Sequence, residues 1–406
     1  MTRSERVAET INREMPDARE LLRLHNAAWT ALPLKGMPRR ERARISVVTD
    51  SINTGSLYGG VGTAFILAVL LARRLDTSLR IVTRREAAEP ANFTTVLQTH
   101  GIPWKQPTEF AFAPIPATEA LETLPDEIFL TTSWWSTASL LPTAGADRIL
   151  YLLQEDERLF YPAGDQHLRA SETLAAPGLR CMVNSRALLE HLAGSGLPQI
   201  ATRGIAFEPA FPWAAYHPEY WGEGERERPR FLFYARPNNL RNLYWRGLEA
   251  ICAALEAGIL DASRWEIRFV GRDLDPIRLP GGVTPIIGQN LPWPEYAAWV
   301  RQTDLGLALM YTPHSSYPPL DLAAGGAAVV TNRFSGKTDL TRLAPNIIMA
   351  DPGIDVLLEG LRQGAALALD RPRRQRNYDA GALPRDWAST LAPVLDWAAA
   401  LDLVAA

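Results

Sequence analysis

Strand-like apolar runs and helix-length segments alternate along most of this chain, in two successive series. Strands that are separated by helices pair in parallel, with the helices covering both faces of the sheet. In the first series we expect strands at ARISVVTD, LRIVT, EIFLTTS, RILYLLQ and LRCMVNS, and helices over residues 63–75 and from Ser185 onward. The pattern therefore predicts an α/β fold built on a doubly wound parallel sheet.

The alternation stops at a Pro- and aromatic-rich stretch, residues 207–229, and then starts again. The second series has expected strands at RFLFYAR, WEIRFVG, LGLALM and AAVVTN, a turn-rich PGGVTPIIG, and helices over 245–257, from Pro294 and over 320–324. A chain of 406 residues is too long for one compact core, which also favours two domains. We expect a helical N-terminal extension over residues 1–44 and Rossmann-like domains over residues 45–215 and 216–382.

Charge, apolar runs and cysteine content indicate which partners and which cellular location to expect. With 42 basic and 45 acidic residues the formal net charge is -3, which gives no general attraction to nucleic acid or an anionic membrane. The charged start lacks the apolar core of a signal peptide, and no run of about 18 apolar residues could span a bilayer. Cys181 and Cys252 show no metal-ligand or redox spacing and are interpreted as buried thiols. We expect a cytoplasmic protein that at most docks peripherally on the inner face of the membrane.

The positions of the loops in the expected sheets indicate where the functional residues lie better than any single short motif does. No zinc, P-loop or nucleophile-elbow pattern occurs and the six histidines do not cluster, which argues against metalloenzymes and hydrolases. Ligands of open α/β sheets bind outside the carboxyl ends of the strands. Two such sheets that face each other place both sets of strand ends along one cleft, so we expect the functional residues in the loops that follow strands.

Two of these loops carry groups suited to phosphates. Gly59 and Gly60 precede a helix, where glycines allow close backbone approach and the helix N-terminus offers free amides, although they could equally make only a tight connection. After the strand RFLFYAR, Arg236 and Arg241 flank Asn238. Two guanidinium groups can clamp a diphosphate and stabilise it as a leaving group. Two surface arginines on an ordinary loop are the alternative.

A third loop, HSSYPPLDL, places Ser316 and Tyr317 before a short helix with Asp321 in its first turn. A carboxylate there can accept hydrogen bonds from ribose or sugar hydroxyls, or it can simply complement the helix dipole. Gly271 ends the strand WEIRFVG and Arg272 follows it, and both are assigned to the same donor-binding site.

A fourth loop combines acidic and aromatic residues. The candidates are Gln154, Glu155, Asp156 and Glu157 after the strand RILYLLQ, and Trp134 and Trp135 after the strand before it. Carboxylates bind sugar hydroxyls and aromatic rings stack on pyranose faces, so this region suits an acceptor or sugar site. A solvated acidic loop beside two core tryptophans is the alternative.

These motifs resemble those of the retaining GT-B glycosyltransferases of family 4. The donor-domain Arg-x4-Lys pair of that family corresponds to Arg236-x4-Arg241, with Arg in place of Lys. Its Glu-x7-Glu motif corresponds to LDLAAGGAAVVTN, with Asp321 at the second Glu, whereas the first Glu falls near Pro313 and His314 and is absent. The closer similarity is to dTDP-rhamnose-dependent bacterial rhamnosyltransferases, over SVVTDSINTGSLYGGVGTA, TTSWWST, YLLQEDERLFYPAGD, YARPNNLRNLYW and YPPLDLAAGGAAVVTN.

The resemblance implies a GT-B fold, with two Rossmann-like domains facing a central cleft, a nucleotide sugar in the second domain and a growing, lipid-linked or free, glycan acceptor in the first. It implies transfer of L-rhamnose from dTDP-L-rhamnose with retention, without a cofactor or metal. Arg236, Arg241 and Asp321 would then act in catalysis, and Gln154 stands where the family has a sugar-contacting His. Residues 383–406 would form a helix that crosses back to the first domain. Other transferases of the same pathway are expected partners.

Two further functions remain open at the level of sequence. A nucleotide-sugar epimerase can use the same architecture, since fold alone does not fix function. A non-catalytic glycan-binding lobe is the third hypothesis, because the first Glu of the family motif is missing. Product analysis separates the first two, and thermal stabilisation by thymidine nucleotides tests the third.

Overall fold

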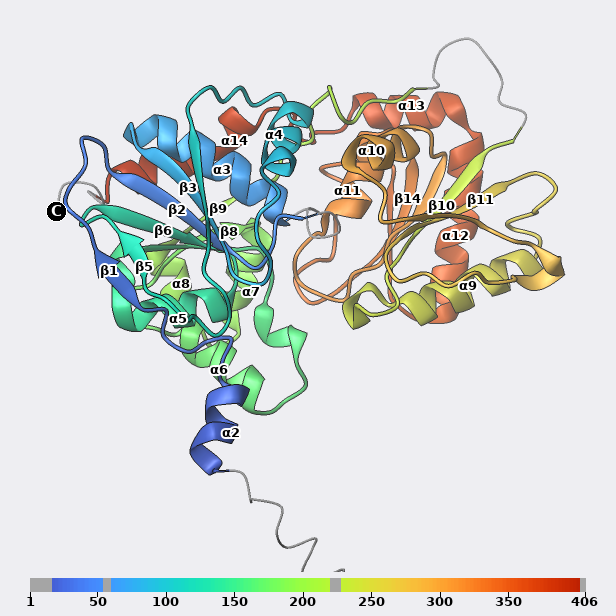
Figure 1. Cartoon of the computed structure of the whole chain (residues 1–406). Coiled ribbons are helices and arrows are strands. Elements are labelled where there is room, and N and C mark those ends of the chain that lie inside the picture. The colour runs from blue at the N-terminus through green and yellow to red at the C-terminus, as the bar shows by residue number, and fades with distance from the viewer. Residues whose placement is uncertain (1–16, 54–59, 220–227, 402–406) are drawn as a thin grey trace, which may run out of the picture.

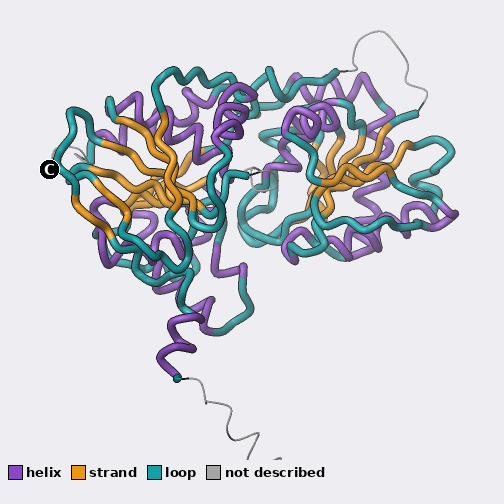
Figure 2. Tube along the Cα trace, viewed as in Figure 1, coloured by secondary structure: helices purple, strands orange, loops and turns teal. Residues whose placement is uncertain are grey.

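This computed structural model describes residues 17–53, 60–219 and 228–401. Two α/β units lie side by side in Figure 1. Figure 2 shows that the strands form the centre of each unit, with helices on both sides. The doubly wound architecture expected from the alternating pattern is therefore present twice.

The first unit contains a seven-stranded sheet in which every neighbouring pair of strands is parallel. In spatial order its strands are β4 (Thr108–Phe112), β3 (Ser78–Thr83), β2 (Arg44–Thr49), β6 (Glu127–Thr131), β7 (Ile149–Leu153), β8 (Arg180–Asn184) and β9 (Gly204–Phe207). Its helices are α3 (Gly60–Leu75), α4 (Pro90–Thr99), α5 (Trp134–Ala144), α6 (Asp165–Leu174), α7 (Arg186–Gly194) and α8 (Pro198–Arg203). All five strands expected in this part of the sequence are found.

The second unit contains a six-stranded parallel sheet. In spatial order its strands are β12 (Ile286–Gln289), β11 (Glu266–Gly271), β10 (Arg230–Ala235), β13 (Leu305–Leu307), β14 (Ala328–Asn332) and β15 (Ile347–Ala350). Its helices are α9 (Tyr244–Glu256), α10 (Trp293–Arg301), α11 (Tyr317–Ala324), α12 (Ile354–Leu369) and α13 (Arg371–Asp379). This strand order is that of nucleotide-binding doubly wound folds.

Alternate residues of the central strands pack on opposite faces of each sheet. In β2, Ile45 and Val47 belong to one buried apolar cluster, whereas Val48 belongs to another. In β10, Phe231 and Leu232 are likewise divided between two clusters. Because both faces of a parallel sheet are covered, its strands read as continuous apolar runs, which is why the sequence located them well.

The segment expected as a helical extension has a different structure where it is described. Helix α2 (Ala18–His25) is present, but β1 (Leu34–Gly36) pairs in parallel with β5 (Leu121–Thr123) in a small separate sheet. The turn-rich PGGVTPIIG leads into the strand β12, which begins at Ile286 and whose edge position explains its weak apolar pattern. Short 3₁₀ helices cover Ala146–Arg148, Glu157–Phe160, Leu240–Asn242 and Pro280–Gly282.

The chain passes between the units twice, and the two passages are bound to each other. The backbone N–H of Phe211 donates to Pro384 O at 2.8 Å, and the Arg385 guanidinium donates to the carbonyls of Phe211 and Tyr216 at 3.1 and 2.9 Å. After the second passage, α14 (Trp387–Ala399) packs on α3 and β9 of the first unit. The last described helix therefore supports the sheet that is farthest from it in sequence.

Within the described residues, none of the helices has the length and apolar character needed to cross a membrane.

The two cysteines differ in burial. Cys181 is buried, and burial raises the pKa of its thiol to about 12. Cys252 is half-buried, so the expectation that both thiols are buried is wrong for this residue. It lies on α9, one side of which faces solvent.

Replacing Trp387 with Ala should lower the free energy of unfolding by about 3 to 5 kcal/mol, because it leaves a cavity between α14 and the first sheet. The indole is 2% exposed and donates to His100 Nδ1 at 3.1 Å. Trp245, which is 70% exposed, provides a matched control, and Trp245→Ala should change stability by less than about 1 kcal/mol. Urea unfolding followed by circular dichroism measures both; equal losses would contradict this role of α14.

Candidate functional site

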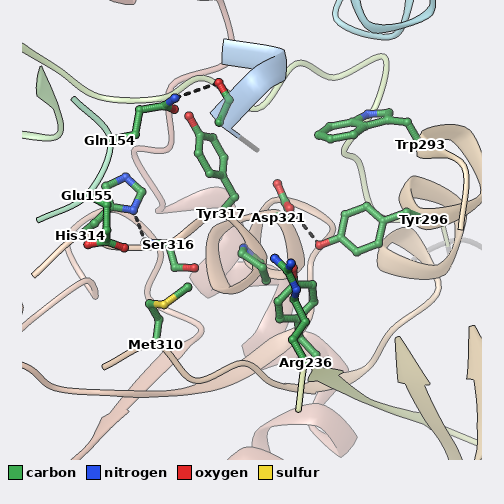
Figure 3. A pocket seen from close by; sticks show the side chains of 13 residues that line it. Gln154, Glu155, Arg236, Trp293, Tyr296, Met310, His314, Ser316, Tyr317 and Asp321 are labelled. Carbon is green, nitrogen blue, oxygen red and sulfur yellow. Dashed lines mark hydrogen bonds between the residues drawn. The ribbon is translucent and has the colours of Figure 1, made fainter. Parts of the chain in front are cut away.

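A pocket lies between the two units, at the carboxyl ends of both sheets. The strand order reverses between β2 and β6 in the first sheet and between β10 and β13 in the second, and doubly wound folds bind ligands at such points. The pocket has a volume of about 660 Å³, which includes the part that is open to solvent. Its lining residues are Gly60, Gln154 and Glu155 from the first unit and Tyr234, Arg236, Trp293, Tyr296, Met310, His314, Ser316, Tyr317, Pro318 and Asp321 from the second (Figure 3).

The wall from the first unit is formed where α3 begins and β7 ends. The Gln154 side chain donates to Gly60 O at 2.8 Å, and a Cβ atom at Gly60 would lie 3.0 Å from Gln154 Nε2. Glycine is thus favoured at this position by the close approach of the glutamine. Gly59, the other glycine proposed from the sequence, lies outside the described residues.

The N-terminus of α11 faces the pocket with an unusual backbone conformation. Ser316, the residue before the helix, has φ 68° and ψ 148°, which non-glycine residues rarely adopt. Its backbone N–H donates to His314 Nδ1 at 2.9 Å, which helps to hold this conformation. Ser316 is therefore fixed at the pocket wall, and its role in donor binding stays a prediction.

Tyr317 links the two units at the edge of the pocket. Its hydroxyl is hydrogen-bonded to Thr63 Oγ1 of α3 and accepts a hydrogen bond from Asn184 Nδ2, at the end of β8, at 2.6 Å. The residue was expected to bind the donor, and in the structure its hydroxyl is used instead to hold the first unit against α11.

Asp321 lies on the floor of the pocket and is 3% exposed. Burial raises its carboxyl pKa to about 7, although hydrogen bonds from Tyr296 and Tyr216 act in the opposite direction. The Tyr296 hydroxyl donates to Asp321 Oδ2 at 2.9 Å. The carboxyl group is thereby oriented, and it titrates near neutral pH.

The two arginines after β10 have different positions. Arg236 lines the pocket, as expected. Arg241 forms an ion pair with Glu155 of the first unit at 3.1 Å and lies 4.1 Å above the centre of the Phe160 ring. The structure therefore places Arg241 as a bridge between the units, beside the pocket rather than among its lining residues.

Glu155 has two cations near it on the second unit. Burial raises the pKa of its carboxyl to about 7, while the charges of Arg241 and Lys337 lower it. Lys337, which the sequence analysis did not single out, is 2% exposed, and its amine donates to Met310 O at 2.6 Å. Glu155 in the pocket wall is thus close to two basic groups that are not themselves among the lining residues.

The other residues of the acidic and aromatic loop are buried supports. Asp156 binds Arg158 at 2.8 Å and His191 at 3.1 Å; burial opposes ionisation, but these partners hold its pKa below the usual range. Glu157 is 4% exposed and accepts the Trp134 backbone N–H at 2.6 Å. The expectation that these acids contact a sugar is therefore wrong for Asp156 and Glu157, because their oxygens are committed to the protein.

The two tryptophans do not offer their faces to the pocket either. Trp134 is 1% exposed and packs among Trp29, Trp135 and Tyr161. The Trp135 indole donates to Asp50 Oδ1 at 2.8 Å. Trp134 is thus a core residue, which corrects its assignment to sugar binding, and Trp135 is not among the lining residues.

The remaining donor-site candidates lie beside the pocket. Gly271 and Arg272 line a smaller adjoining cavity, together with Arg236. A Cβ atom at Gly271 would lie 1.7 Å from Ala235 O, so no larger residue fits between the ends of β10 and β11. Asn238 is exposed and lines neither cavity.

Several pocket residues carried no signal that the sequence analysis used. Trp293 and Tyr296 come from α10, and Met310 follows β13. The sequence analysis mentioned His314 only because it lies where the first Glu of the Glu-x7-Glu motif is missing. The motif HSSYPP could have pointed to His314, whereas Lys337 lies in a loop that reads as an ordinary surface turn. In the described ranges, no three His, Cys, Asp or Glu side chains gather as a metal ion would require.

Replacing Glu157 with Gln should stabilise the protein increasingly as the pH rises. Burial raises the Glu157 pKa from 4.5 to about 8, so the stability that its neutral form contributes is lost as the pH rises from about 5 to 8. Gln keeps an acceptor for the Trp134 N–H and does not titrate. The difference in Tm should be near zero at pH 5 and reach roughly 5 °C at pH 8. Glu119→Gln, at an exposed site, is the control, and a constant difference would contradict the assignment.

Solved structures with the same architecture decide the fold. Sucrose-phosphate synthase from Thermosynechococcus elongatus matches with a TM-score of 0.57 at 13% identity, over 89% of this chain and 99% of that one. WaaG, a glycosyltransferase involved in lipopolysaccharide biosynthesis, matches with 0.56 at 12% identity, over 87% and 99%. The fold is GT-B. HepE of Anabaena, solved in complex with UDP-glucose, also matches, with 0.59 at 11% identity over 88% and 99%.

The sequence matches a family model in part and also matches a longer protein. Residues 229–362 match the family model described as WsaF, C-terminal domain, which covers most of the second unit. The O-antigen biosynthesis protein RfbC of Myxococcus xanthus is 28% identical over 398 residues. The match covers 91% of this chain, which spans only 30% of the length of RfbC. The expected GT-B fold is thus confirmed, and the sugar stays a prediction.

Proposed function

We propose that this chain is a glycosyltransferase that moves a sugar from a nucleotide diphosphate donor to a growing bacterial surface glycan. The observation that carries the proposal is the pocket at the reversal point of both sheets, where Arg236 and the N-terminus of α11 meet residues of the opposite unit. Helix N-termini and guanidinium groups both bind phosphate oxygens. The similarity to RfbC, whose name places it in O-antigen biosynthesis, supports the glycan as acceptor.

The proposed donor is dTDP-L-rhamnose. It is supported by the resemblance of the motifs to rhamnosyltransferases and by the match of the second unit to the WsaF C-terminal domain. Met310 and Trp293 add apolar surface to the pocket, on which the methyl group of a 6-deoxy sugar can pack. HepE shows that a protein of this fold binds a nucleotide sugar, in that case UDP-glucose.

The proposed reaction proceeds with retention at the anomeric carbon. The bond from that carbon to the phosphate oxygen breaks, the acceptor oxygen bonds to the same face, and its proton passes to the departing phosphate. Arg236 and the amides of α11 stabilise the phosphate charge, and the protein contributes mainly by positioning. Asp321 can accept hydrogen bonds from ribose or sugar hydroxyls. These groups would hold a diphosphate without a metal ion.

The site of action is proposed to be the inner face of the cytoplasmic membrane. A lipid-linked acceptor would bring the enzyme there, together with other transferases of the same pathway. The pocket is lined by residues of both units, and the acceptor would enter along the wall formed by Gln154 and Glu155.

A panel of nucleotide sugars tests the donor. Because a ligand stabilises the state that binds it, dTDP-L-rhamnose should raise the Tm more than dTDP-glucose, UDP-glucose or GDP-mannose at equal concentration. A larger shift with another sugar would keep the transferase and discard rhamnose. Product analysis that finds an altered nucleotide sugar without glycan extension would indicate an epimerase, and no shift with any donor would indicate a non-catalytic lobe.

Removing either arginine should lower turnover. Arg236→Ala and Arg241→Ala are each expected to reduce kcat by ~10²-fold, the range for loss of one group that stabilises developing charge. Arg236→Ala removes a guanidinium group that lines the pocket, and Arg241→Ala removes the ion pair with Glu155. Arg362→Ala, at an exposed position of α12, is the control. Full activity of Arg236→Ala would remove it from the phosphate site.

A further inference from the structure

His314 presents an unsatisfied donor at the pocket wall. Its Nδ1 accepts the Ser316 backbone N–H at 2.9 Å, and burial lowers the pKa of the ring to about 3, so the imidazole is neutral at physiological pH. A neutral imidazole whose Nδ1 accepts must carry its proton on Nε2. In the described part of the chain, this buried Nε2 has no hydrogen-bond partner. A ligand atom that accepts a hydrogen bond would satisfy it.

Lys337 presents two more unsatisfied donors beside it. An ammonium group carries three N–H bonds, and among the described residues its one hydrogen-bond acceptor is Met310 O. That carbonyl also accepts from Asn332 at 3.1 Å, and Asn332 Oδ1 accepts from the Met310 N–H at 2.7 Å. The Met310 backbone is thus held in place, and it fixes the amine next to Met310, which is itself a lining residue of the pocket.

The charges in this region do not balance. Lys337 and Arg241 both interact electrostatically with Glu155, and His314 feels the positive charge of both. Burial lowers the Lys337 pKa to about 8, raises the Glu155 pKa to about 7, and raises the pKa of Glu157, which also interacts with Arg241, to about 8. Near neutral pH the two cations therefore face one partly ionised acid and one mostly neutral acid. A buried excess of positive charge is costly unless an anion compensates it.

We propose that His314 and Lys337 bind phosphate oxygens of the nucleotide diphosphate, and so complete the phosphate site that Arg236 begins. Figure 3 shows His314 and Met310 on the same side of the pocket as Glu155, with Arg236 farther across and Ser316 between them. A phosphate group has acceptors for the three free N–H bonds and supplies the missing negative charge. A sugar hydroxyl could accept the bonds but would leave the charge uncompensated. This inference rests on the proposed function for the identity of the nucleotide.

Isothermal titration of the full chain with inorganic pyrophosphate, thymidine, dTMP, dTDP and dTDP-L-rhamnose tests this assignment. Lys337→Met should weaken pyrophosphate and dTDP at least about 10-fold and leave thymidine unchanged, because only the phosphate contact is removed. His314→Asn keeps a side-chain acceptor for the Ser316 N–H but loses the Nε2 donor, and should weaken the same ligands about 5-fold. Lys105→Met, at an exposed site, is the control.

Stability of the ligand-free variants separates a binding role from a structural one. Because Lys337 is buried with two unsatisfied donors, Lys337→Met should keep or raise the Tm without ligand, while the Tm increase caused by dTDP becomes smaller. A residue needed only for folding would show the reverse, a lower Tm with unchanged affinity for pyrophosphate.

Each other outcome also has a definite meaning. If wild type does not bind pyrophosphate, or if Lys337→Met binds it equally well, the assignment is overturned. A loss confined to dTDP-L-rhamnose, with dTDP unchanged, would also overturn it and place these groups against the sugar. If pyrophosphate binds through Lys337 but no nucleotide sugar does, the phosphate site stands and the proposed transferase function fails.

Discussion

A partly buried ion pair between Glu155 and Arg241 links the two units. It joins the loop after β7 to the loop after β10, so it crosses directly beside the pocket. Taking both charges out of water costs free energy that their attraction repays only in part, as the raised carboxyl pKa of about 7 indicates. The pair is therefore a contact that an anion can exchange. Under the proposed function, a diphosphate would compete for Arg241, and the released carboxyl group could become neutral.

The two units are also joined beside the pocket by side-chain hydrogen bonds and by the contact of Arg241 with the Phe160 ring. Tyr317 reaches Thr63 and Asn184, and His191 lies 3.2 Å from Ser335 Oγ. Each such bond contributes about 0.5 to 1.5 kcal/mol. At the hinge, by contrast, Arg385 binds both passages of the chain. Opening would thus break exchangeable bonds at the pocket and leave the hinge intact, which suits the proposed transferase function, since such an enzyme must admit two substrates.

The sequence predicted most of the fold because buried parallel strands carry a strong local signal. Edge strands carry a weaker one: β12 pairs only with β11, and Ile286 is 47% exposed, so its segment resembles a turn. In the site, the positions after strand ends identified Arg236, Ser316, Gln154, Glu155 and Asp321. Sequence spacing cannot show which way a side chain points. It therefore did not reveal that the Trp134 side chain is buried in the core or that the Glu157 carboxyl group is buried and accepts the Trp134 backbone N–H. Lys337 was missed because a lysine in a polar loop is normally exposed.

The missing first Glu of the family motif changes the chemistry of one wall. At positions 313 and 314 the chain has Pro and His, so this wall donates hydrogen bonds, through the buried imidazole and the nearby ammonium of Lys337, where a carboxylate would accept them. Acceptors remain at Glu155 and Asp321. The pocket therefore offers donors on one side and acceptors on the others. Inorganic pyrophosphate can satisfy the donors alone and a free glycan lacks the anion, whereas a nucleotide sugar presents both anionic oxygens and hydroxyl groups and can engage both sides.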